Sequence, residues 1–380
     1  MKTSTNRFLT THTGSLPRPR HLLDLYGRSA ADEVDAVLAE AVKSVVAQQV
    51  DTGIDVINDG EFGKAVRSTG DADHGHGTWN LYICERVTGL TNAAEDTWKD
   101  RRSKDRAAFS GYYGDAVQKS NPNACVGEVR FQGDDLVDRD LKNLTAALGT
   151  TSPAEAFLPA VSPASIVYAF PNIYYSDDDE YRRAVAEAVR EEYLAIAEAG
   201  FTLQIDDPVL VASWDVWPDS DLQAYRRVAA RDVELLNHAL RGIPAEQVRY
   251  HLCWGSWNGP HSTDLPLADI VDLMLQVSAG GYVVEAANPQ HEHEWKVWKD
   301  VRLPDDKILI PGVVTHKTPV IEHPEVVADR IVRYAEVVGR ERVVAGTDCG
   351  VGGRIAPDVA WAKLASLVEG AQHASARLWT

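Results

Sequence analysis

The chain has 380 residues, 44% of them hydrophobic, which is enough for a substantial core in one large or two ordinary domains. Its 38 basic and 56 acidic residues give a formal net charge of −18, which argues against nucleic acid or an anionic membrane surface as a partner. No apolar stretch reaches the roughly 20 residues of a membrane helix, and no apolar signal segment follows Met1, so we expect a cytoplasmic protein.

Apolar strand segments alternate with amphipathic helix segments along most of the chain. Helices are predicted at 33–53, 180–200, 267–281 and 325–339. Eight strands are predicted within 7–15, 55–59, 156–161, 203–206, 249–253, 282–286, 308–314 and 343–348. Continuous apolar strands joined by helices are typical of a (β/α)8 TIM barrel. A doubly wound open sheet is disfavoured, because no G-x-G-x-x-G motif follows an early strand.

Residues 67–150 interrupt this alternation, between the second and the third predicted strand. The stretch is rich in charged and glycine residues, and we interpret it as an insertion with its own helix and hairpin. An insertion at the end of a barrel can act as a lid over the site. A solvated excursion without a role is the alternative. The rest of 1–380 is interpreted as a single catalytic barrel.

A metal site is predicted from residues at the carboxyl ends of the later strands, where barrels carry their chemistry. His251 and Cys253 are two residues apart on one strand, so both side chains leave by the same face. Glu285 ends the next strand, and Cys349 follows the last one. These four residues form a plausible tetrahedral Zn²⁺ set. Buried bystander thiols, or a structural zinc site, are the alternatives.

The same ligand set predicts the type of reaction. Two thiolates and one carboxylate more than cancel the two positive charges of zinc, so water bound there would be poorly activated. An incoming thiol bound there as thiolate would stay nucleophilic, which is what alkyl transfer to sulfur requires. The expected partners are therefore a small-molecule thiol and an alkyl donor. The sequence leaves the oligomeric state open, a homo-oligomer included.

Seven motifs in order resemble the catalytic barrel of cobalamin-independent methionine synthases, in particular the single-barrel branch that includes epoxyalkane:coenzyme M transferase. They are HTGSLPRP, DVINDGEFG, LQIDDP, HLCWGS, VVEAANP, PGVVTHK and GTDCG, and they span nearly all of the chain outside 67–150. The resemblance implies zinc held by His251, Cys253, Glu285 and Cys349. It also implies a role in methionine biosynthesis.

The resemblance further implies where a thiol amino acid binds. Glu61 and Asp206 would hold its ammonium group, and Gly14 with Ser15 its carboxylate. His316 would be the general acid that protonates the leaving group. Asp206 as a loop cap and His316 as an ordinary loop histidine are the alternatives. His12, in the first motif, is placed with the substrate-binding residues.

Tryptophans follow the proposed ligand Cys253. Trp254 and Trp257 would wall an apolar donor pocket, and packing beneath loops is an equal alternative. The segment HEHEW, residues 291–295, is interpreted as the start of a surface helix rather than as a second metal cluster.

Three functions remain open from the sequence. The first is zinc-dependent methyl transfer to homocysteine or a related thiol. The second is epoxide opening by a zinc-bound thiolate such as that of coenzyme M, which requires a cation for the sulfonate. The third is a zinc-free barrel decarboxylase.

Overall fold

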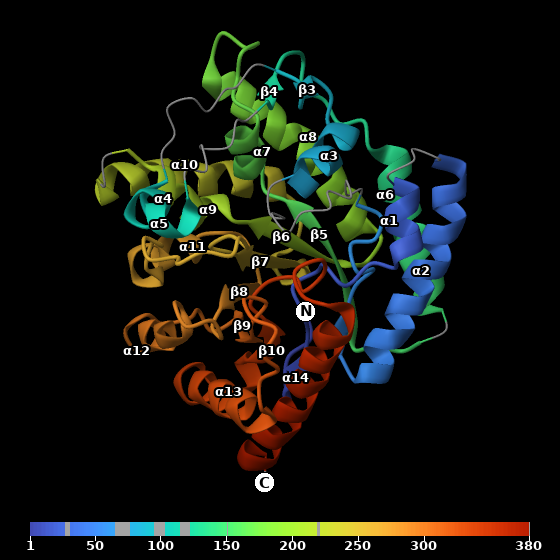
Figure 1. Ribbon diagram of the computed structural model, residues 1–380, viewed down its shortest axis with the longest axis vertical. Coiled ribbons are helices and arrows are strands. Elements are labelled where there is room, and N and C mark those ends of the chain that lie inside the picture. The colour runs from blue at the N-terminus through green and yellow to red at the C-terminus, as the bar shows by residue number, and fades with distance from the viewer. Residues whose placement is uncertain are drawn as a thin grey trace.

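The predicted (β/α)8 fold is confirmed. The computed structural model describes residues 1–26, 31–64, 77–94, 103–114, 122–149, 151–218 and 221–379. Here eight parallel strands form one sheet in the order β1-β10-β9-β8-β7-β6-β5-β2. A parallel bridge between Thr11 and Val56 joins its two edges, so the sheet curls into a barrel surrounded by helices (Figure 1).

Each of the eight strands lies within or overlaps a segment predicted from the sequence. Nearly all of their residues are buried, because helices cover the outer face and side chains fill the barrel. The strands are β1 (Leu9–Thr10), β2 (Val56–Ile57), β5 (Glu155–Val161), β6 (Thr202–Asp207), β7 (Val248–Leu252), β8 (Gly281–Glu285), β9 (Ile308–Val314) and β10 (Val344–Thr347).

The outer helices are amphipathic and begin at capping residues. In α8, Tyr181, Val185 and Val189 recur every four residues on the buried face, and the side chain of Asp177 caps the first turn. The outer helices are α1 (Arg20–Tyr26), α2 (Ala31–Thr52), α6 (Asp134–Leu148), α7 (Pro163–Ala169), α8 (Asp178–Glu198), α9 (Val209–Ala212), α10 (Leu222–Leu240), α11 (Val271–Met274), α12 (Val297–Asp300), α13 (Pro324–Val338) and α14 (Pro357–Leu378). Among helices of the described ranges, none is long and apolar enough to cross a membrane.

One predicted helix is much shorter than expected. Instead of a helix over 267–281, the chain forms a 3-10 turn, Leu267–Asp269, followed by α11. The side chain of Asn237 in α10 replaces the next helical hydrogen bonds: its Nδ2 donates to the carbonyl of Gln276, and its Oδ1 accepts from the amide of Ser278. A side chain that satisfies these main-chain groups removes the gain from continuing the helix.

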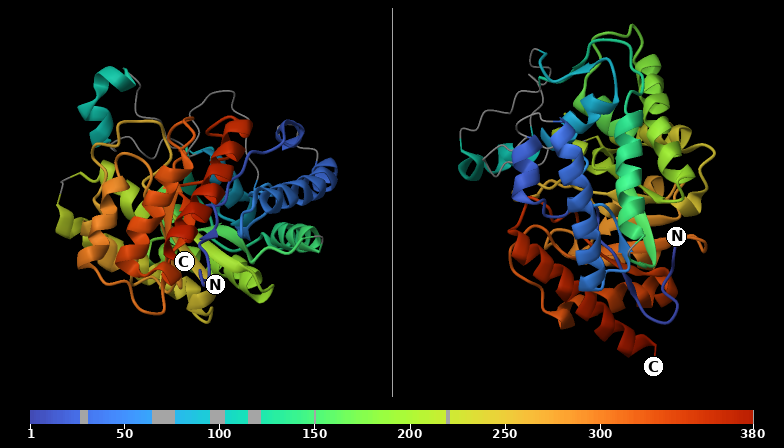
Figure 2. Two further views of the ribbon diagram at one scale, coloured as in Figure 1. Left: turned by 90° about the horizontal axis from the view of Figure 1, so that it is seen from below. Right: turned by 90° about the vertical axis from the view of Figure 1, so that its right-hand side faces the viewer.

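Between β2 and β5 the structure describes several short elements and α6. They are α3 (Gly77–Arg86), β3 (Leu90–Thr91), α4 (Lys104–Ala108), α5 (Ser110–Tyr113) and β4 (Ala124–Cys125). β3 and β4 pair as a separate antiparallel sheet. α4 and α5 stand out from the barrel (Figure 2), whereas α6 packs against α2 and α8 as an outer helix. Parts of 67–150 (67–76, 95–102, 115–121 and 150) lie outside the described residues, and the lid stays a prediction.

A buried ion cluster ties α3 to the outer helices. Arg86 is 2% exposed; its guanidinium lies 2.8 Å from an oxygen of Asp140 in α6 and 3.3 Å from one of Glu192 in α8. The hydroxyl of Tyr82 donates to the other oxygen of Glu192. Arg86 therefore contacts two buried carboxylates, of which Asp140 is also paired with Arg139, 2.9 Å away.

Replacing Arg86 by methionine should lower the free energy of unfolding by about 3–5 kcal/mol, because buried Glu192 would lose its counter-charge and Asp140 would keep only that of Arg139. Urea unfolding followed by circular dichroism measures this change. Arg302→Met breaks an exposed pair with Asp305 and should leave the unfolding midpoint nearly unchanged. Equal midpoints for Arg86→Met and the parent would contradict this assignment.

Candidate metal and thiol site

Strand alternation aims two predicted ligands into the barrel mouth. In β7, Tyr250 points outward and donates to Asp207, whereas Arg249 points inward and donates to Thr11 and to the carbonyl of His12. His251 and Cys253 continue the inward series of Arg249. Because the residues of β7 are buried and paired on both sides, this orientation is fixed.

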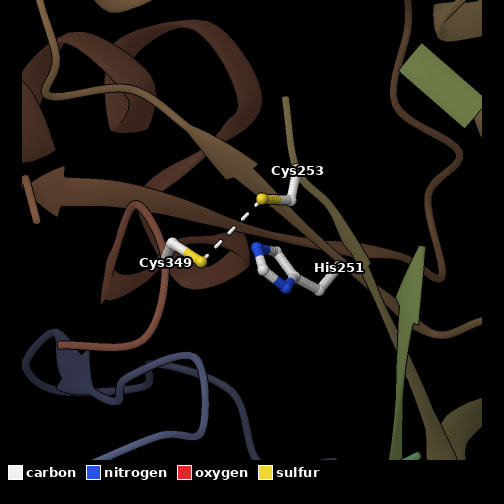
Figure 3. Close-up of side chains that lie close together, drawn as sticks. All are labelled: His251, Cys253 and Cys349. Atoms are coloured by element: carbon white, nitrogen blue, oxygen red, sulfur yellow. Dashed lines mark hydrogen bonds between the residues drawn. The ribbon is translucent and has the colours of Figure 1, made fainter. Parts of the chain in front are cut away.

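The sulfur atoms of Cys253 and Cys349 lie 3.8 Å apart, and with a nitrogen of His251 they form a set in which all ligand atoms lie within 4.8 Å of one another (Figure 3). Two sulfurs at the usual Zn–S length of about 2.3 Å in a tetrahedron are roughly 3.8 Å apart. The separation is far longer than the roughly 2.05 Å of a disulfide. These three side chains therefore fit a zinc ion.

Asp206 sets the orientation of the His251 ring. β6 and β7 pair Asp206 directly with His251, and the ring Nδ1 donates to Asp206 Oδ1 across 2.9 Å. Gln204 donates to the same oxygen. Nε2 is then left facing the sulfurs, as in carboxylate–histidine–zinc triads. Burial opposes protonation of His251, but the Asp206 contact outweighs it and raises the histidine pKa.

Glu285, the fourth predicted ligand, is buried at the end of β8 beside the two cysteines but lies outside that set of three. Its carboxylate accepts from the amide of Trp254 and from the side chain of Asn288. Asp348, next to Cys349, accepts from the amides of Ala286 and Ala287, so β10 is fastened to the end of β8. Asn288 donates to both Glu285 and Asp348, so Glu285 and the residue before Cys349 belong to one hydrogen-bonded unit.

The two thiols differ in their protonation. Cys253 donates its S–H toward Cys349, and this contact lowers the pKa of Cys349 to about 6. The same contact, together with burial, raises the pKa of Cys253 well above its usual value. The contact therefore favours the thiolate at Cys349 and the thiol at Cys253, and a divalent cation bound to both would displace the remaining proton.

Gly14 and Glu61 meet on the other side of the mouth. A Cβ on Gly14 would lie 2.1 Å from Glu61 Oε1, so only glycine admits the carboxylate there. Glu61 is 6% exposed, has a left-handed φ of 61°, and accepts no hydrogen bond at its carboxylate from any side chain or amide of the described ranges. Burial raises its pKa to about 7, with Lys64 opposing and Asp206 adding to the shift.

Ser15 and His12 lie in the turn after β1. The Ser15 carbonyl accepts from the amides of Val351 and Gly352, which ties this turn to the loop that follows Cys349. His12 is fully buried; its Nε2 donates to Gln49, and its Nδ1 accepts from the amide of Gly14. Burial lowers the pKa of His12 to about 4, so its ring is neutral and holds Gly14 in place.

His316 follows β9 and is 2% exposed. Neither ring nitrogen has a hydrogen-bond partner within the part of the chain that the structure describes. Burial, and then the nearby charges of Lys317 and Arg354, lower its pKa well below the usual value. A buried imidazole with both nitrogens unpaired costs free energy unless a ligand supplies the partner.

The two tryptophans take different positions. Trp254 is fully buried; its indole donates to the carbonyl of Leu265, and its ring lies 4.0 Å from that of His291. Trp257 is half-buried and stacks on His261. The structure therefore places Trp257, and not Trp254, at a partly open surface.

The interpretation of 291–295 as a surface segment is wrong for His291 and Glu294. Both are 3% exposed, and His291 donates to Glu294 and Asp264. Two carboxylates outweigh burial and raise the pKa of His291 to about 10. The 3-10 helix Glu292–Lys296 does begin there, and His293 and Lys296 are exposed, but Glu294 faces a buried network.

Sequence reasoning did not assign Lys317 and Arg354, which reach the loops that follow the two cysteines. Nor did it identify contacts from α4 to the same region: the carboxylate of Asp105 accepts from the amide and hydroxyl of Ser262. The sequence does place basic residues after several strand ends. Their spacing does not show which of them contact the cysteine loops.

Comparison with known proteins identifies the family. The model described as "Cobalamin-independent synthase, Catalytic domain" matches residues 168–373, more than half of the chain. The 2-hydroxypropyl-CoM lyase of Xanthobacter autotrophicus is 24% identical over 97% of this chain and 95% of its own. A methionine synthase of Thermococcus kodakarensis is 24% identical over 96% and 92%.

Solved structures agree on the fold. A B12-independent methionine synthase from Shewanella sp. W3-18-1, in complex with selenomethionine, aligns with a TM-score of 0.73 at 19% identity, covering 98% of this chain and 99% of that one. A Listeria monocytogenes protein described as "Putative Vitamin-B12 Independent Methionine Synthase" has a TM-score of 0.65 at 20% identity, covering 97% of this chain and 98% of that one. The resemblance inferred from the motifs is thereby confirmed: this chain belongs to the cobalamin-independent methionine synthase catalytic domain family.

Proposed function

We propose that this protein is a zinc-dependent thiol alkyltransferase that transfers a methyl group to homocysteine or a related amino-acid thiol. The observation that carries the proposal is the set of His251, Cys253 and Cys349, whose ligand atoms have the mutual spacing of a zinc site. Family membership supports the same chemistry.

His251, Cys253 and Cys349 would hold the ion, with Glu285 as the fourth ligand. Zinc bound to these anionic ligands would stabilise the substrate thiol as a thiolate that stays nucleophilic. The chain's own contribution is to orient the set: Asp206 fixes the ring of His251, and Asn288 with the amide of Trp254 fixes Glu285. A site of two free thiols also suits a reducing compartment such as the cytoplasm.

Glu61 and Asp206 would bind the ammonium group of the thiol amino acid. Both are buried, their charges influence each other, and the carboxylate of Glu61 has no partner in the described ranges to displace. A cation between them would relieve the repulsion of two nearby carboxylates. Gly14 and Ser15, in the adjoining turn, would receive the carboxylate.

His316 would act on the leaving group. Its two unpaired nitrogens leave it free to donate a hydrogen bond to an incoming molecule. Because burial and neighbouring cations keep the ring neutral, we propose that its N–H first hydrogen-bonds the leaving atom. Proton transfer would then follow as negative charge develops on that atom. Trp257 would flank the donor, and α4 and α5 would close over it.

The test is an activity screen of zinc-loaded protein with homocysteine, other amino-acid thiols and coenzyme M, each against methyl donors and epoxides. Methyl transfer to an amino-acid thiol that stops on zinc removal supports the proposal. Full activity in protein shown by metal analysis to lack zinc would overturn it.

Epoxide opening by a sulfonate-bearing thiol is the second candidate, because Lys317 and Arg354 provide cations near the cysteines. The 24% identical 2-hydroxypropyl-CoM lyase is consistent with it. Competition separates the two: coenzyme M that displaces homocysteine and supports epoxide consumption would favour this candidate.

The Michaelis constant for an amino-acid thiol should fall about tenfold between pH 6 and pH 8. Glu61, with a pKa of about 7, is mostly protonated at the lower pH and ionised at the higher, and only the carboxylate attracts ammonium. Steady-state kinetics across this range measure the trend. A thiol without an amino group serves as the control.

Glu61→Gln should remove that pH dependence and raise the Michaelis constant about 10- to 150-fold, the equivalent of one charge-assisted hydrogen bond of roughly 1.5–3 kcal/mol. An unchanged constant and an unchanged pH profile would show that the ammonium is not held by Glu61.

A further inference from the structure

Arg354 connects the two loops that carry the cysteines. Its Nη1 donates to the carbonyl of Gly350, the residue after Cys349, across 2.8 Å. Its Nη2 donates to the hydroxyl of Ser256, three residues after Cys253. One planar guanidinium thus bridges segments that leave β10 and β7, strands that are not neighbours in the sheet.

Lys317 holds the Cys253 loop from a third strand end. Its ammonium donates to the carbonyl of Gly255 and to Nε2 of His261, each across 2.8 Å. Gly255 has a left-handed φ of 89°, and a Cβ there would lie 2.1 Å from the Trp257 ring. The loop therefore makes a tight turn that requires glycine at position 255. This turn points the Gly255 carbonyl toward Lys317.

A buried chain of polar groups supports Lys317. Nε2 of His261 lies 2.8 Å from the Lys317 ammonium and 3.0 Å from the Trp257 carbonyl, and its Nδ1 donates to Asp264, 4% exposed at its side chain. Asp264 also accepts from His291, which in turn donates to Glu294, and Glu294 accepts from the amide of Leu267. Donation converges on the carboxylates of Asp264 and Glu294, which thereby hold the two histidine rings in place.

We propose that Arg354 and Lys317 are positioning residues that set the affinity and geometry of the metal site. Arg354 holds the loops after Cys253 and Cys349 together, and Lys317 anchors the Cys253 loop to the end of β9. The inference rests on the proposed function only for the presence of a metal. Neither residue is a ligand; each acts through main-chain and side-chain groups of the loops beside the ligands. Hydrogen bonds through Glu285, Asn288 and Asp348 also link the two strand ends. Without Arg354 and Lys317 the loops would lose their own ties, and the 3.8 Å spacing of the sulfurs would be held less tightly before binding.

The two cations also reduce the cost of gathering negative charge. Both cysteines and the carboxylates of Glu285, Asp348 and Asp206 converge on the barrel mouth, and gathering negative charge in a buried site is costly. Positive charge fixed near them on rigid loops offsets part of their mutual repulsion. The contacts of Arg354 and Lys317 thus fix the positions of the loops and also place positive charge beside the acidic groups.

The experiment measures metal affinity by chelator competition and the absorption of the cobalt(II)-substituted protein in the thiolate-to-cobalt charge-transfer region. Arg354→Met should weaken zinc about 10- to 100-fold, as loss of an outer-shell partner does, and should shift or weaken the cobalt bands. Arg354→Lys should recover part of the affinity, because an ammonium reaches one loop but lacks the fork that bridges both. Lys317→Met should show the same defect.

Arg342→Met is the matched control. Arg342 also binds main-chain carbonyls, those of Leu303, Pro304 and Lys307, but it lies before β10, at the other end of the barrel. Its loss should leave zinc affinity and cobalt spectra at the parent values. Ser256→Ala removes only the acceptor of Arg354, so it tests the bridge even if Arg354→Met fails to fold.

The outcomes separate the two proposals. Parent-like zinc affinity and cobalt spectra in Ser256→Ala and in the folded Arg354 and Lys317 variants would overturn this inference and leave the proposed function standing. A parent protein that binds neither zinc nor cobalt would overturn both. Weaker metal binding in these variants, with metal-free melting temperatures unchanged, would establish positioning rather than general destabilisation.

Discussion

Cys253→Ser is expected to abolish zinc binding at micromolar chelator concentrations and to reduce thiol alkylation below detection. The substitution removes a thiolate, and a serine hydroxyl does not ionise at neutral pH to replace it. The loss should exceed the roughly 10- to 100-fold that removal of an outer-shell partner costs. Metal analysis after dialysis, together with a single-turnover assay, measures both effects.

The fold should survive this change. Cys253 lies just beyond the end of β7, and serine keeps nearly the same volume and an acceptor for the amide of Gly255, now 3.3 Å from the sulfur. Cys84→Ser is the matched control, because Cys84 is half-buried in α3 and outside the cluster, and burial raises its pKa to about 11. Zinc retained by Cys253→Ser and parent alike would rule out this thiol as a ligand.

Much of the barrel could be predicted because most strands are recognisable from their own short stretch of sequence. Segments such as 308–314 are continuous apolar runs bounded by polar residues, and they became strands buried on both faces. The helix over 267–281 was overpredicted because its apolar spacing is helical, whereas a side chain distant in sequence, Asn237, takes the main-chain groups. Such competition is tertiary and leaves no local signal.

The metal trio could be predicted for a similar reason. His251 and Cys253 share a strand face by period alone, and strand ends converge in any barrel. The outer partners could not be predicted, because they depend on strand register and loop conformation. The contact of Asp206 with His251 requires these residues to be paired across β6 and β7, and a shift of one residue would turn Asp206 away.

Asp206→Asn should weaken zinc binding about 10- to 100-fold and, independently, raise the Michaelis constant for an amino-acid thiol. Asparagine keeps an oxygen that can accept from His251 and Gln204, so the geometry is retained while the charge is lost. The pKa of His251, now raised by Asp206, should fall, and NMR titration of the metal-free protein measures that shift.

Asp207→Asn provides the control for this charge. Asp207 is the next residue of β6 and is also buried, but it faces the helices and accepts from Tyr250. Its substitution should leave zinc affinity and the His251 titration unchanged. If both variants bound zinc as tightly as the parent, Asp206 would be only a substrate residue. A change in the Michaelis constant without a change in metal affinity would locate its role at the ammonium group. A change in both would show that one carboxylate orients the ligand and receives the thiol amino acid.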